Sequence, residues 1–423
     1  MRLPYTEVQF DEKGVPAEPD QLREAASLVR DRNATDVILL SHGWNNTAAQ
    51  ARDLYERIVA SIVAVRDRVP GATDRRIVVV GMVWPSIQWA AEEDSGAGAG
   101  IEDDAAVLAA EIRSRVEDAA TATRLAALIP RLRTDSAAQA EFVSLLRGTL
   151  PNSTKGEDEA AFTALKTGDP AQVFEAAKDS GSDDAAPAAV GGAADIDPAG
   201  LAPLEDGGAA GFFDGLISAA RNLLNVTTYY TMKERAGLVG RKGMARLLEE
   251  LHATASDARL HLVGHSFGGR AVTAAALAAD APVSSLSLLQ AAYSHFGMAH
   301  DWDGAGTDGL FAAVPAKVLG PVLVTFTHND KAVGVAYPVA SRLARQIGAG
   351  LGDENDPYGG IGRNGALRTP ASLPAADLAD VGGTYAFRPG HVSSLRADDF
   401  VSGHSDIAGR QVAYAVLTAI TST

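Results

Sequence analysis

The feature that most constrains this chain is a Gly-x-Ser-x-Gly pentapeptide, Gly264-His265-Ser266-Phe267-Gly268. It follows an apolar run at 259–263 and precedes an alanine-rich stretch at 271–279, an order that predicts a strand, a sharp turn and a helix. Such a turn strains the serine backbone, and the two glycines let neighbouring backbone approach it closely. The pattern therefore predicts Ser266 as a catalytic nucleophile, and a serine that only caps a helix is the alternative.

A serine hydroxyl becomes a strong nucleophile when a histidine takes its proton and an acid orients that histidine. Asp330 follows an apolar run at 321–327 that predicts a buried strand. This position places Asp330 at the carboxyl edge of a parallel sheet, where open sheets carry their site residues. A turn aspartate that caps the next helix is the alternative reading of Asp330, and Asp301 and Asp303 are the other candidate acids.

Two histidines lie late enough in the chain to act as the base. His404 immediately precedes the last helical stretch, predicted at 408–419, whereas His391 lies in a loop beside a proline and a glycine. A loop between the last strand and the last helix is the usual place for this base, so His404 is the preferred candidate. Besides His42, six other histidines precede Asp330 in the chain and are therefore expected to be core or surface residues. They are His252, His261, His265, His295, His300 and His328.

An early apolar run at 37–41 ends in His42-Gly43-Trp44. A His-Gly turn after an early strand directs a backbone N–H toward the carbonyl oxygen of a substrate. We assign this donor to Trp44, and Gly43 lets the loop approach because it has no side chain. The second donor is the N–H of Phe267, which follows the nucleophile. Together the two predict an oxyanion hole.

These residues together resemble the α/β-hydrolase superfamily, and within it bacterial serine hydrolases of the lipase or esterase type. The likeness rests on Ser41-His42-Gly43-Trp44, Trp84-Pro85-Ser86, a helix at 230–240 before the pentapeptide, and His404-Ser405-Asp406. It covers residues 35–90 and 225–420. It implies an α/β-hydrolase fold with a doubly wound, mostly parallel sheet, a Ser-Asp-His triad, and neither a metal nor an organic cofactor.

The chain of 423 residues is longer than such a core needs, which is about 250 to 300 residues, so an insertion is expected. We predict a core of residues 1–90 and 225–423 and a helical cap insertion at 91–224. Within the insertion, residues 103–128 and 136–145 have apolar residues at helical spacing, whereas 178–210 has too few to form a core and predicts a flexible tether. A solvated decoration unrelated to the site is the alternative.

Alternating patterns predict the remaining elements of the core. The expected strands lie near 36–41, 76–83, 258–263, 285–292, 321–327 and 384–388, and the expected helices near 47–66, 228–251, 268–280, 332–347 and 407–420. A long loop is expected at 351–378. Its run of acidic residues at 353–356 lacks the ligand spacing of a calcium-binding loop, so no metal site is predicted there.

The formal net charge of −16 argues against nucleic-acid binding and against docking on anionic membranes. A basic cluster formed by Lys233, Arg235, Arg241 and Lys242 is expected to be an ordinary solvated helix face. The chain has no cysteine, no signal-peptide pattern and no apolar run long enough to span a bilayer, so a cytoplasmic protein without stable membrane insertion is expected. Its oligomeric state cannot be derived from these patterns.

Several aromatic and amide side chains follow predicted strands and are candidates for the substrate pocket, with core packing as the alternative for each. They are Trp44, Trp84, Gln88, Trp89, Tyr293 and Phe296. The leading functional hypothesis is a serine hydrolase that cleaves small-molecule carboxylic esters through an acyl-enzyme. The alternatives are an amidase or peptidase with the same triad, and a non-catalytic hydrolase-fold protein that uses its acidic insertion to bind a partner.

Overall fold

The structure is a computed structural model that describes residues 3–86, 104–154, 156–178, 208–330 and 359–423. Its centre is one eight-stranded sheet with the strand order β1-β3-β2-β4-β5-β6-β8-β7, in which every pair is parallel. The strands are β1 Tyr5–Gln9, β2 Asp36–Ser41, β3 Ile77–Val83, β4 Arg259–His265, β5 Val283–Leu289, β6 Val322–Phe326, β7 Ala376–Asp377 and β8 Val392–Arg396. The predicted α/β class and parallel sheet are therefore confirmed, and the sheet is parallel throughout.

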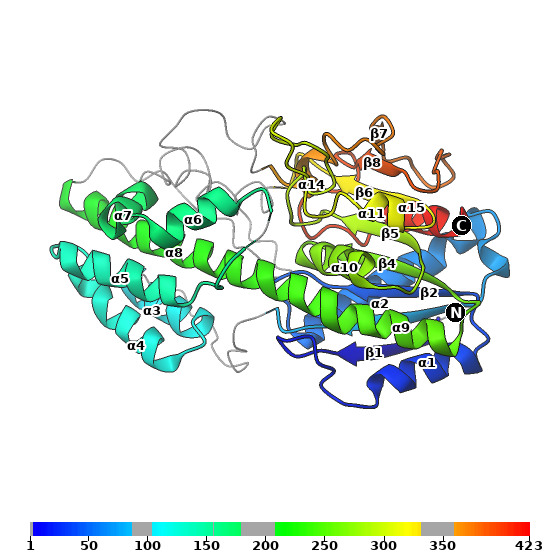
Figure 1. The fold of residues 1–423 in the computed structure, drawn as a ribbon, viewed down its shortest axis with the longest axis horizontal. Helices are drawn as coiled ribbons and strands as arrows, with labels where there is room; N and C mark the ends of the chain where they lie inside the picture. Colours follow the sequence, from blue (N-terminus) through cyan, green and yellow to red (C-terminus); the bar gives the residue numbers. More distant parts are fainter. Residues whose placement is uncertain (1–2, 87–103, 155, 179–207, 331–358) are drawn as a thin grey trace.

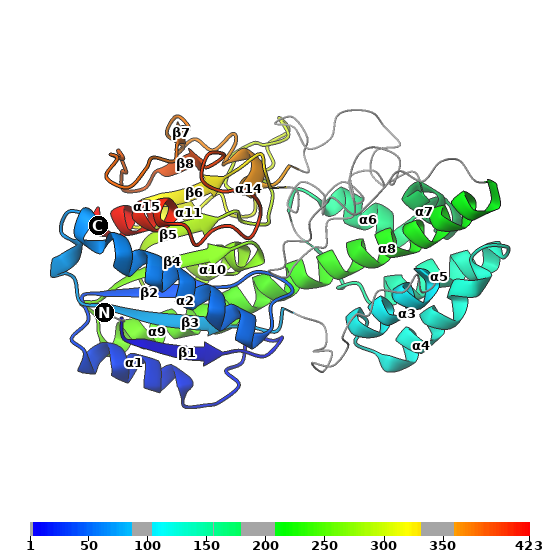
Figure 2. The same cartoon turned by 180° about the vertical axis from the view of Figure 1, so that it is seen from behind.

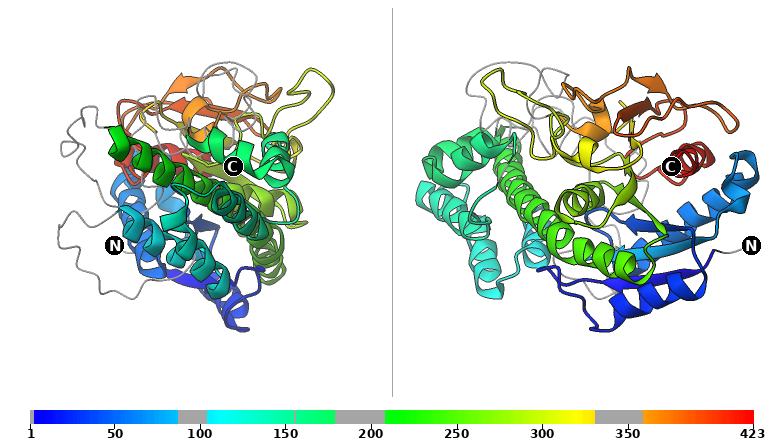
Figure 3. Two further views of the ribbon diagram at one scale, coloured as in Figure 1. Left: turned by 90° about the vertical axis from the view of Figure 1, so that its left-hand side faces the viewer. Right: turned by 45° about the vertical axis from the view of Figure 1, so that its right-hand side comes forward.

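Helices cover both faces of this sheet (Figures 1 and 2). Side chains of successive strand residues point to opposite faces, so Val37 and Leu39 of β2 join one apolar cluster while Ile38 and Leu40 join the other. The first face is covered by α1 Gln21–Asp31, α9 Ala245–Thr254 and α10 Phe267–Ala278, and the second by α2 Ala48–Val65 and α15 Arg410–Thr421. The right-hand view of Figure 3 shows the two helical layers with the sheet between them.

A second lobe of helices lies beyond the carboxyl ends of the strands, the ends toward which the arrow of β1 points in Figures 1 and 2. It contains α3 Asp104–Arg115, α4 Ala119–Leu128, α5 Ser136–Gly148, α6 Glu159–Thr167 and α7 Pro170–Lys178, packed around the first part of α8 Gly208–Val239. The helices expected at 103–128 and 136–145 are therefore present. The lobe lies at the edge of the sheet where the candidate site residues are expected.

Helix α8 joins the lobe to the core without a break (Figure 1). It is 32 residues long and continues through a π-helical turn, Gly240–Met244, into α9. At this turn a Cβ on Gly240 would lie 2.2 Å from the carbonyl oxygen of Ala271, so the glycine lets α10 pack directly against the turn. The boundary expected between residues 224 and 225 thus falls inside one continuous helix, and the helix predicted at 228–251 starts earlier and includes the π turn.

The expectation that the basic cluster of α8 is a solvated face is wrong for two of its four members. Lys233 and Arg235 are buried, whereas Arg241 and Lys242, in the π turn, are exposed. Lys233 is paired with Asp158 and Arg235 with Glu117, and both acids belong to the helical lobe. The correction follows from the position of α8 between the lobe and the core, because a helix packed on two sides has little solvated surface.

The strand predicted at 384–388 is also wrong. The sheet instead takes up residues 392–396 as β8, while Tyr385 and Phe387 lie outside any strand and their rings stack on each other beside Tyr414 of α15. The apolar content of the segment therefore reflects packing on a helix. The short strands β1 and β7 and the helix α1 were not predicted. Two further short helices are α11 Val314–Lys317 and α14 Ile361–Asn364.

Several predictions concern residues outside the described ranges. They are the tether at 178–210 over its residues 179–207, the helix at 332–347, the first part of the loop at 351–378 with its acidic run at 353–356, and the pocket candidates Gln88 and Trp89. From residue 359 the expected loop is described, and it contains the short helix α14 and the strand β7. Among the helices that the structure does describe, none has both the length and the apolar character needed to cross a membrane.

Candidate active site

Ser266 lies in the sharp turn between β4 and α10. Its φ of 55° and ψ of −127° fall in a region that residues other than glycine rarely adopt. A Cβ on Gly264 would lie 2.5 Å from the carbonyl oxygen of Gly268, and one on Gly268 would lie 2.4 Å from that of Ser41, so the turn closes only with glycine at both positions. The predicted strand, turn and helix are therefore present, with the serine at the carboxyl edge of the sheet.

A chain of hydrogen bonds joins Ser266 to His404 and Asp330. His404 Nε2 lies 2.9 Å from Ser266 Oγ, and His404 Nδ1 lies 2.7 Å from Asp330 Oδ2. Because a carboxylate only accepts, Nδ1–H donates to Asp330 and Nε2 is left to accept the serine proton. Asp330 is fully buried, whereas the side chain of His404 keeps 16% of its surface exposed. The structure thus brings together the three residues predicted from the sequence.

The alternative acids and base lie in other networks. The side chain of Asp301 accepts a hydrogen bond from the backbone of Gly306, and that of Asp303 accepts from the backbone of Ala305, so both close their own exposed loop. His391 Nδ1 lies 2.8 Å from the carbonyl oxygen of Pro389, two residues before it. The structure places none of the three in the hydrogen-bond chain of Ser266.

The turn that carries Asp330 is held by two neighbours that the sequence did not single out. Arg363 donates hydrogen bonds to the carbonyl oxygens of His328 and Asp330 at 2.6 and 3.0 Å. Asp398 accepts from the backbone N–H of His328 and from the hydroxyl of Thr327, both at 2.8 Å. Although burial acts in the opposite direction, these hydrogen bonds, with that of the His328 ring, hold the pKa of Asp398 below its usual value. The backbone around Asp330 is therefore anchored on both sides.

His265, the residue before the nucleophile, anchors the loop that carries the base. Its Nε2 lies 2.9 Å from the carbonyl oxygen of His404, so it donates its proton there, and the two imidazole rings are 4.8 Å apart. Burial, reinforced by the proximity of His404, lowers the pKa of His265 to about 3. A neutral His265 can hold the loop without adding a positive charge beside His404. The sequence shows a histidine directly before the serine, but it does not show that the side chain of this histidine points toward the loop of His404.

The loop at 42–46 lies against the nucleophile, because a Cβ on Gly43 would be only 2.6 Å from the Cβ of Ser266. Trp44 is buried, and its ring contacts that of Phe267 edge-on at 6.0 Å. Tyr229 of α8 contacts the same phenylalanine at 5.5 Å. Rings from the loop, from α10 and from α8 are therefore packed beside Ser266, and the last of them comes from the helix that enters the lobe.

The other aromatic pocket candidates are packed inside the protein. Trp84 is buried under the loop at 42–46, where its ring stacks on His42. Tyr293 is buried with its hydroxyl 3.3 Å from that of Thr273, and Phe296 is buried with its ring stacked on Trp302 and in contact with the guanidinium of Arg368. A role in contacting substrate stays a prediction for these residues, and their observed contacts are those of core side chains.

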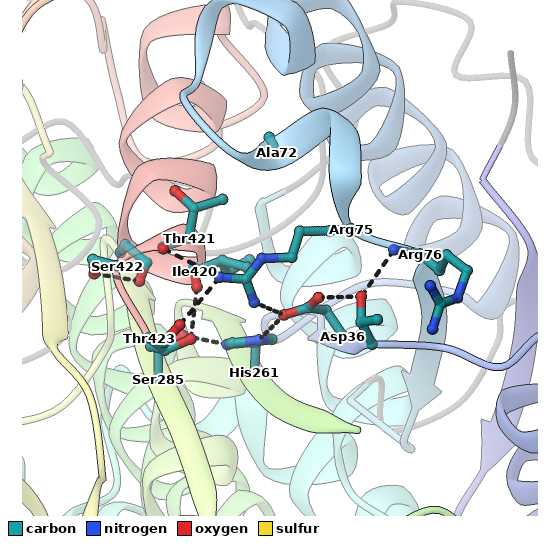
Figure 4. A network of polar contacts seen from close by, with 12 residues as sticks. Asp36, Ala72, Arg75, Arg76, His261, Ser285, Ile420, Thr421, Ser422 and Thr423 are labelled. Carbon is teal, nitrogen blue, oxygen red and sulfur yellow. Dashed lines mark hydrogen bonds and ion pairs between the residues drawn. The ribbon is translucent and has the colours of Figure 1, made fainter. Parts of the chain in front are cut away.

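A second group of polar residues lies at the opposite edge of the sheet, where the strands begin (Figure 4). His261 Nε2 lies 3.1 Å from Asp36 Oδ1, and His261 Nδ1 lies 2.8 Å from Ser285 Oγ. Arg75 donates to Asp36 at 2.8 Å and also to the backbone oxygens of Thr421, the last residue of α15, and of Thr423. Asp36, His261 and Ser285 are all fully buried. This amino-edge network ties three strands to the last helix.

Comparison of the chain with protein-family models, with curated proteins and with solved structures found no match. The class of protein therefore follows from the fold and from the site alone. The fold is α/β with an all-parallel sheet flanked by helices, and the site is a hydrogen-bonded Ser-His-Asp group at the carboxyl edge of that sheet.

Proposed function

We propose that this chain is a serine hydrolase of the α/β-hydrolase type that cleaves carboxylic esters of small molecules. One observation carries the proposal: Ser266, in a strained turn, is hydrogen-bonded to His404, which is hydrogen-bonded to the buried Asp330. The three residues follow β4, β6 and β8, in the chain order serine, acid and histidine that is typical of that fold. In this proposal they form a catalytic triad.

The proposed reaction has two steps of the same kind. His404 Nε2 takes the proton of Ser266 as Oγ attacks the ester carbonyl, and the imidazolium then gives that proton to the leaving alcohol. Water attacks the acyl-enzyme, again losing its proton to His404, which returns it to Ser266 as the acid product leaves. Asp330 keeps the imidazole in the required tautomer and stabilises its charged form throughout.

The negative oxygen that forms in each step needs hydrogen-bond donors. We assign these to the backbone N–H groups of Trp44 and Phe267. Phe267 is the first residue of α10, so its N–H lies at a helix N-terminus, where donors lack partners within the helix and the dipole favours negative charge. The proximity of Gly43 to Ser266 supports the assignment of Trp44.

The helical lobe supports a role as a cap over this site. It lies beyond the carboxyl ends of the strands, and α8 brings Tyr229 from it to the ring of Phe267. Two ion pairs join the lobe to α8: Asp158 with Lys233, which is buried, and Glu117 with Arg235, in which the glutamate is exposed. A cap in this position can exclude water and select among acyl groups.

A fluorophosphonate probe tests the proposal directly, because it reacts with an activated serine. We expect stoichiometric labelling of the wild-type chain, no labelling of Ser266→Ala, and unchanged labelling of Ser285→Ala, which lacks a serine in the amino-edge network. A wild-type chain that stays unlabelled would favour the non-catalytic, partner-binding alternative. A panel of p-nitrophenyl esters and aminoacyl amides then separates an esterase from an amidase.

A further inference from the structure

The imidazole of His42, the first residue of the loop at 42–46, is fully buried, and its two nitrogens have different partners. The backbone N–H of Trp84 donates to Nε2 at 3.1 Å, so Nε2 carries the lone pair. The proton of the neutral ring is therefore on Nδ1, which lies 2.9 Å from the carbonyl oxygen of Gly43 and donates to it. The surrounding backbone thus selects one tautomer of this histidine.

Further contacts hold His42 and the loop in this arrangement. The Trp84 ring stacks on the imidazole with centroids 5.4 Å apart and an interplanar angle of 11°, and its Nε1–H donates to the His42 carbonyl oxygen. The backbone N–H of His42 donates to the Tyr55 hydroxyl at 2.8 Å. Asn46 Nδ2 gives the Gly43 carbonyl oxygen a second donor at 3.3 Å. Burial lowers the pKa of His42 to about 4, which keeps the ring neutral.

The bond from His42 to Gly43 has a consequence for the next residue. A trans peptide is planar, and its C=O and N–H point in opposite directions. The Gly43 carbonyl is held toward His42 and Asn46, so the N–H of Trp44, in the same peptide plane, points away from them. Gly43 is also the residue of this loop that lies against Ser266, at a separation that a Cβ would close to 2.6 Å.

We propose that His42 is a positioning residue that locks the Gly43–Trp44 peptide with its N–H toward the oxygen of the acyl group on Ser266. The inference rests on the proposed function, since a donor for that oxygen matters only if Ser266 is acylated. His42 touches neither substrate nor reacting atoms, and it acts through the peptide. Without the lock the peptide can rotate, and one of the two oxyanion donors is lost for part of the time.

Two substitutions that both replace the imidazole with a side-chain amide separate this role from simple packing. The side-chain amide of asparagine reaches about as far as Nδ1 of histidine, so His42→Asn can still donate to Gly43. The amide of glutamine reaches about as far as Nε2, so His42→Gln can accept from Trp84 but leaves Gly43 without this donor. Both variants lose the ring that stacks on Trp84, and their losses of stability should be similar.

We expect His42→Gln to lose at least about tenfold in kcat for an ester with KM nearly unchanged, because a fully removed oxyanion donor costs about a hundredfold or more. His42→Asn should lose less. The preference for the ester over its thionoester, whose sulfur is a weaker acceptor, should shrink in His42→Gln and persist in His42→Asn. Equal losses in both variants, or a smaller loss in His42→Gln, would overturn the inference.

If both variants fail to fold, the tautomer can be read in the wild-type chain. With ¹⁵N-labelled histidine, the nitrogen chemical shifts of His42 should report a protonated Nδ1 and an unprotonated Nε2 at neutral pH, and an Nε2–H tautomer would overturn the inference. Labelling of wild-type Ser266 by the fluorophosphonate probe is a separate result. A labelled wild type with equal losses in the two variants rejects the role of His42 alone, whereas an unlabelled wild type rejects the proposed function.

Discussion

The two edges of the sheet carry the same three residue types in the same hydrogen-bonded order. At the carboxyl edge they are Ser266, His404 and Asp330, and at the amino edge they are Ser285, His261 and Asp36 (Figure 4). The two groups differ in backbone and in exposure. Ser285 and His261 lie within regular strands and are fully buried, whereas Ser266 lies in a strained turn and His404 in a loop with part of its ring exposed.

The imidazole rings of His404 and His261 are also oriented differently toward their serines. The serine lies at Nε2 of His404 but at Nδ1 of His261. In addition, Arg75 is paired with the amino-edge aspartate. Although burial acts in the opposite direction, the hydrogen bonds of His261 and Thr35, with a smaller contribution from the charge of Arg75, hold the pKa of Asp36 below its usual value. The comparison teaches that contact among Ser, His and Asp does not by itself distinguish an active site. What sets the proposed site apart is the strained backbone of Ser266 and the partly exposed ring of His404, since Ser266 keeps only 5% of its surface exposed against none for Ser285.

The largest expected effect tests this contrast through the two serines. Ser266→Ala should lower kcat by at least about a thousandfold, because a triad member commonly supplies several kcal/mol of barrier reduction, while leaving the chain folded. Ser285→Ala should keep its activity, since no substrate can reach a fully buried hydroxyl. Ester hydrolysis and circular dichroism of both variants check this. Near wild-type hydrolysis by Ser266→Ala would transfer the nucleophile to another residue.

The next effect concerns stability and belongs to the amino edge. Arg75→Met leaves the buried carboxylate of Asp36 without its cationic partner, and breaking a buried pair in this way costs about 3 kcal/mol of unfolding free energy. The exposed Arg76 offers a matched control, because Arg76→Met should change stability by less than about 0.5 kcal/mol. Urea unfolding measures both. Equal midpoints for the two variants would show that the amino-edge network contributes little.

The carboxyl edge was more predictable from the sequence than the amino edge, for a physical reason. Ser266 sits in a turn that requires glycines at fixed positions, and Asp330 follows a continuous apolar run, so local sequence marks both. Asp36, His261 and Ser285 lie inside apolar strands with no local marker. Their pairing depends on strand order and register, such as the alignment of His261 with Ser285, which only the folded sheet defines.

The errors have the same origin. Lys233 has the local sequence of an exposed helix residue, and it is buried because the lobe supplies Asp158 from 75 positions earlier in the chain. The strand predicted at 384–388 has an apolar pattern that is satisfied by the α15 side chain of Tyr414 instead of by a neighbouring strand. Local patterns identify which residues are apolar, and long-range packing decides what covers them.

A third prediction uses pH, because the carboxyl edge holds two neutral buried histidines beside its base. The pKa is about 4 for His42 and about 3 for His265, against a value near 6.5 in an unfolded chain. Between these pKa values the unfolded chain binds more protons than the folded chain. The contribution of each neutral histidine to the unfolding free energy is therefore fully present above about pH 6.5 and is lost as the pH falls toward 4. Each histidine should contribute a loss of about 2 kcal/mol between pH 7.5 and pH 5.

Unfolding free energies of the wild type and of His265→Gln at the two pH values measure this effect. The variant cannot take up a proton at position 265, so its loss between pH 7.5 and pH 5 should be about 2 kcal/mol smaller than that of the wild type. His300→Gln removes an exposed histidine and should keep the wild-type loss. An equal loss in the wild type and in His265→Gln would mean that His265 is not held neutral.

The smallest effect sharpens the comparison between the two edges by testing what presents the base. His404 lies in a loop, and the bond from His265 Nε2–H to its carbonyl oxygen replaces the fixed geometry that a strand gives to His261. The amide of glutamine can reproduce a donor at Nε2, whereas that of asparagine reaches only the position of Nδ1. His265→Asn should therefore lose about tenfold in kcat, equivalent to about 1.4 kcal/mol, and His265→Gln should lose less. This order is the reverse of the one expected at His42, so the same pair of substitutions distinguishes the two positions. If asparagine and glutamine gave equal activity at position 265, the loop would be held by its other contacts, and the bond from His404 to Asp330 would be the first to examine.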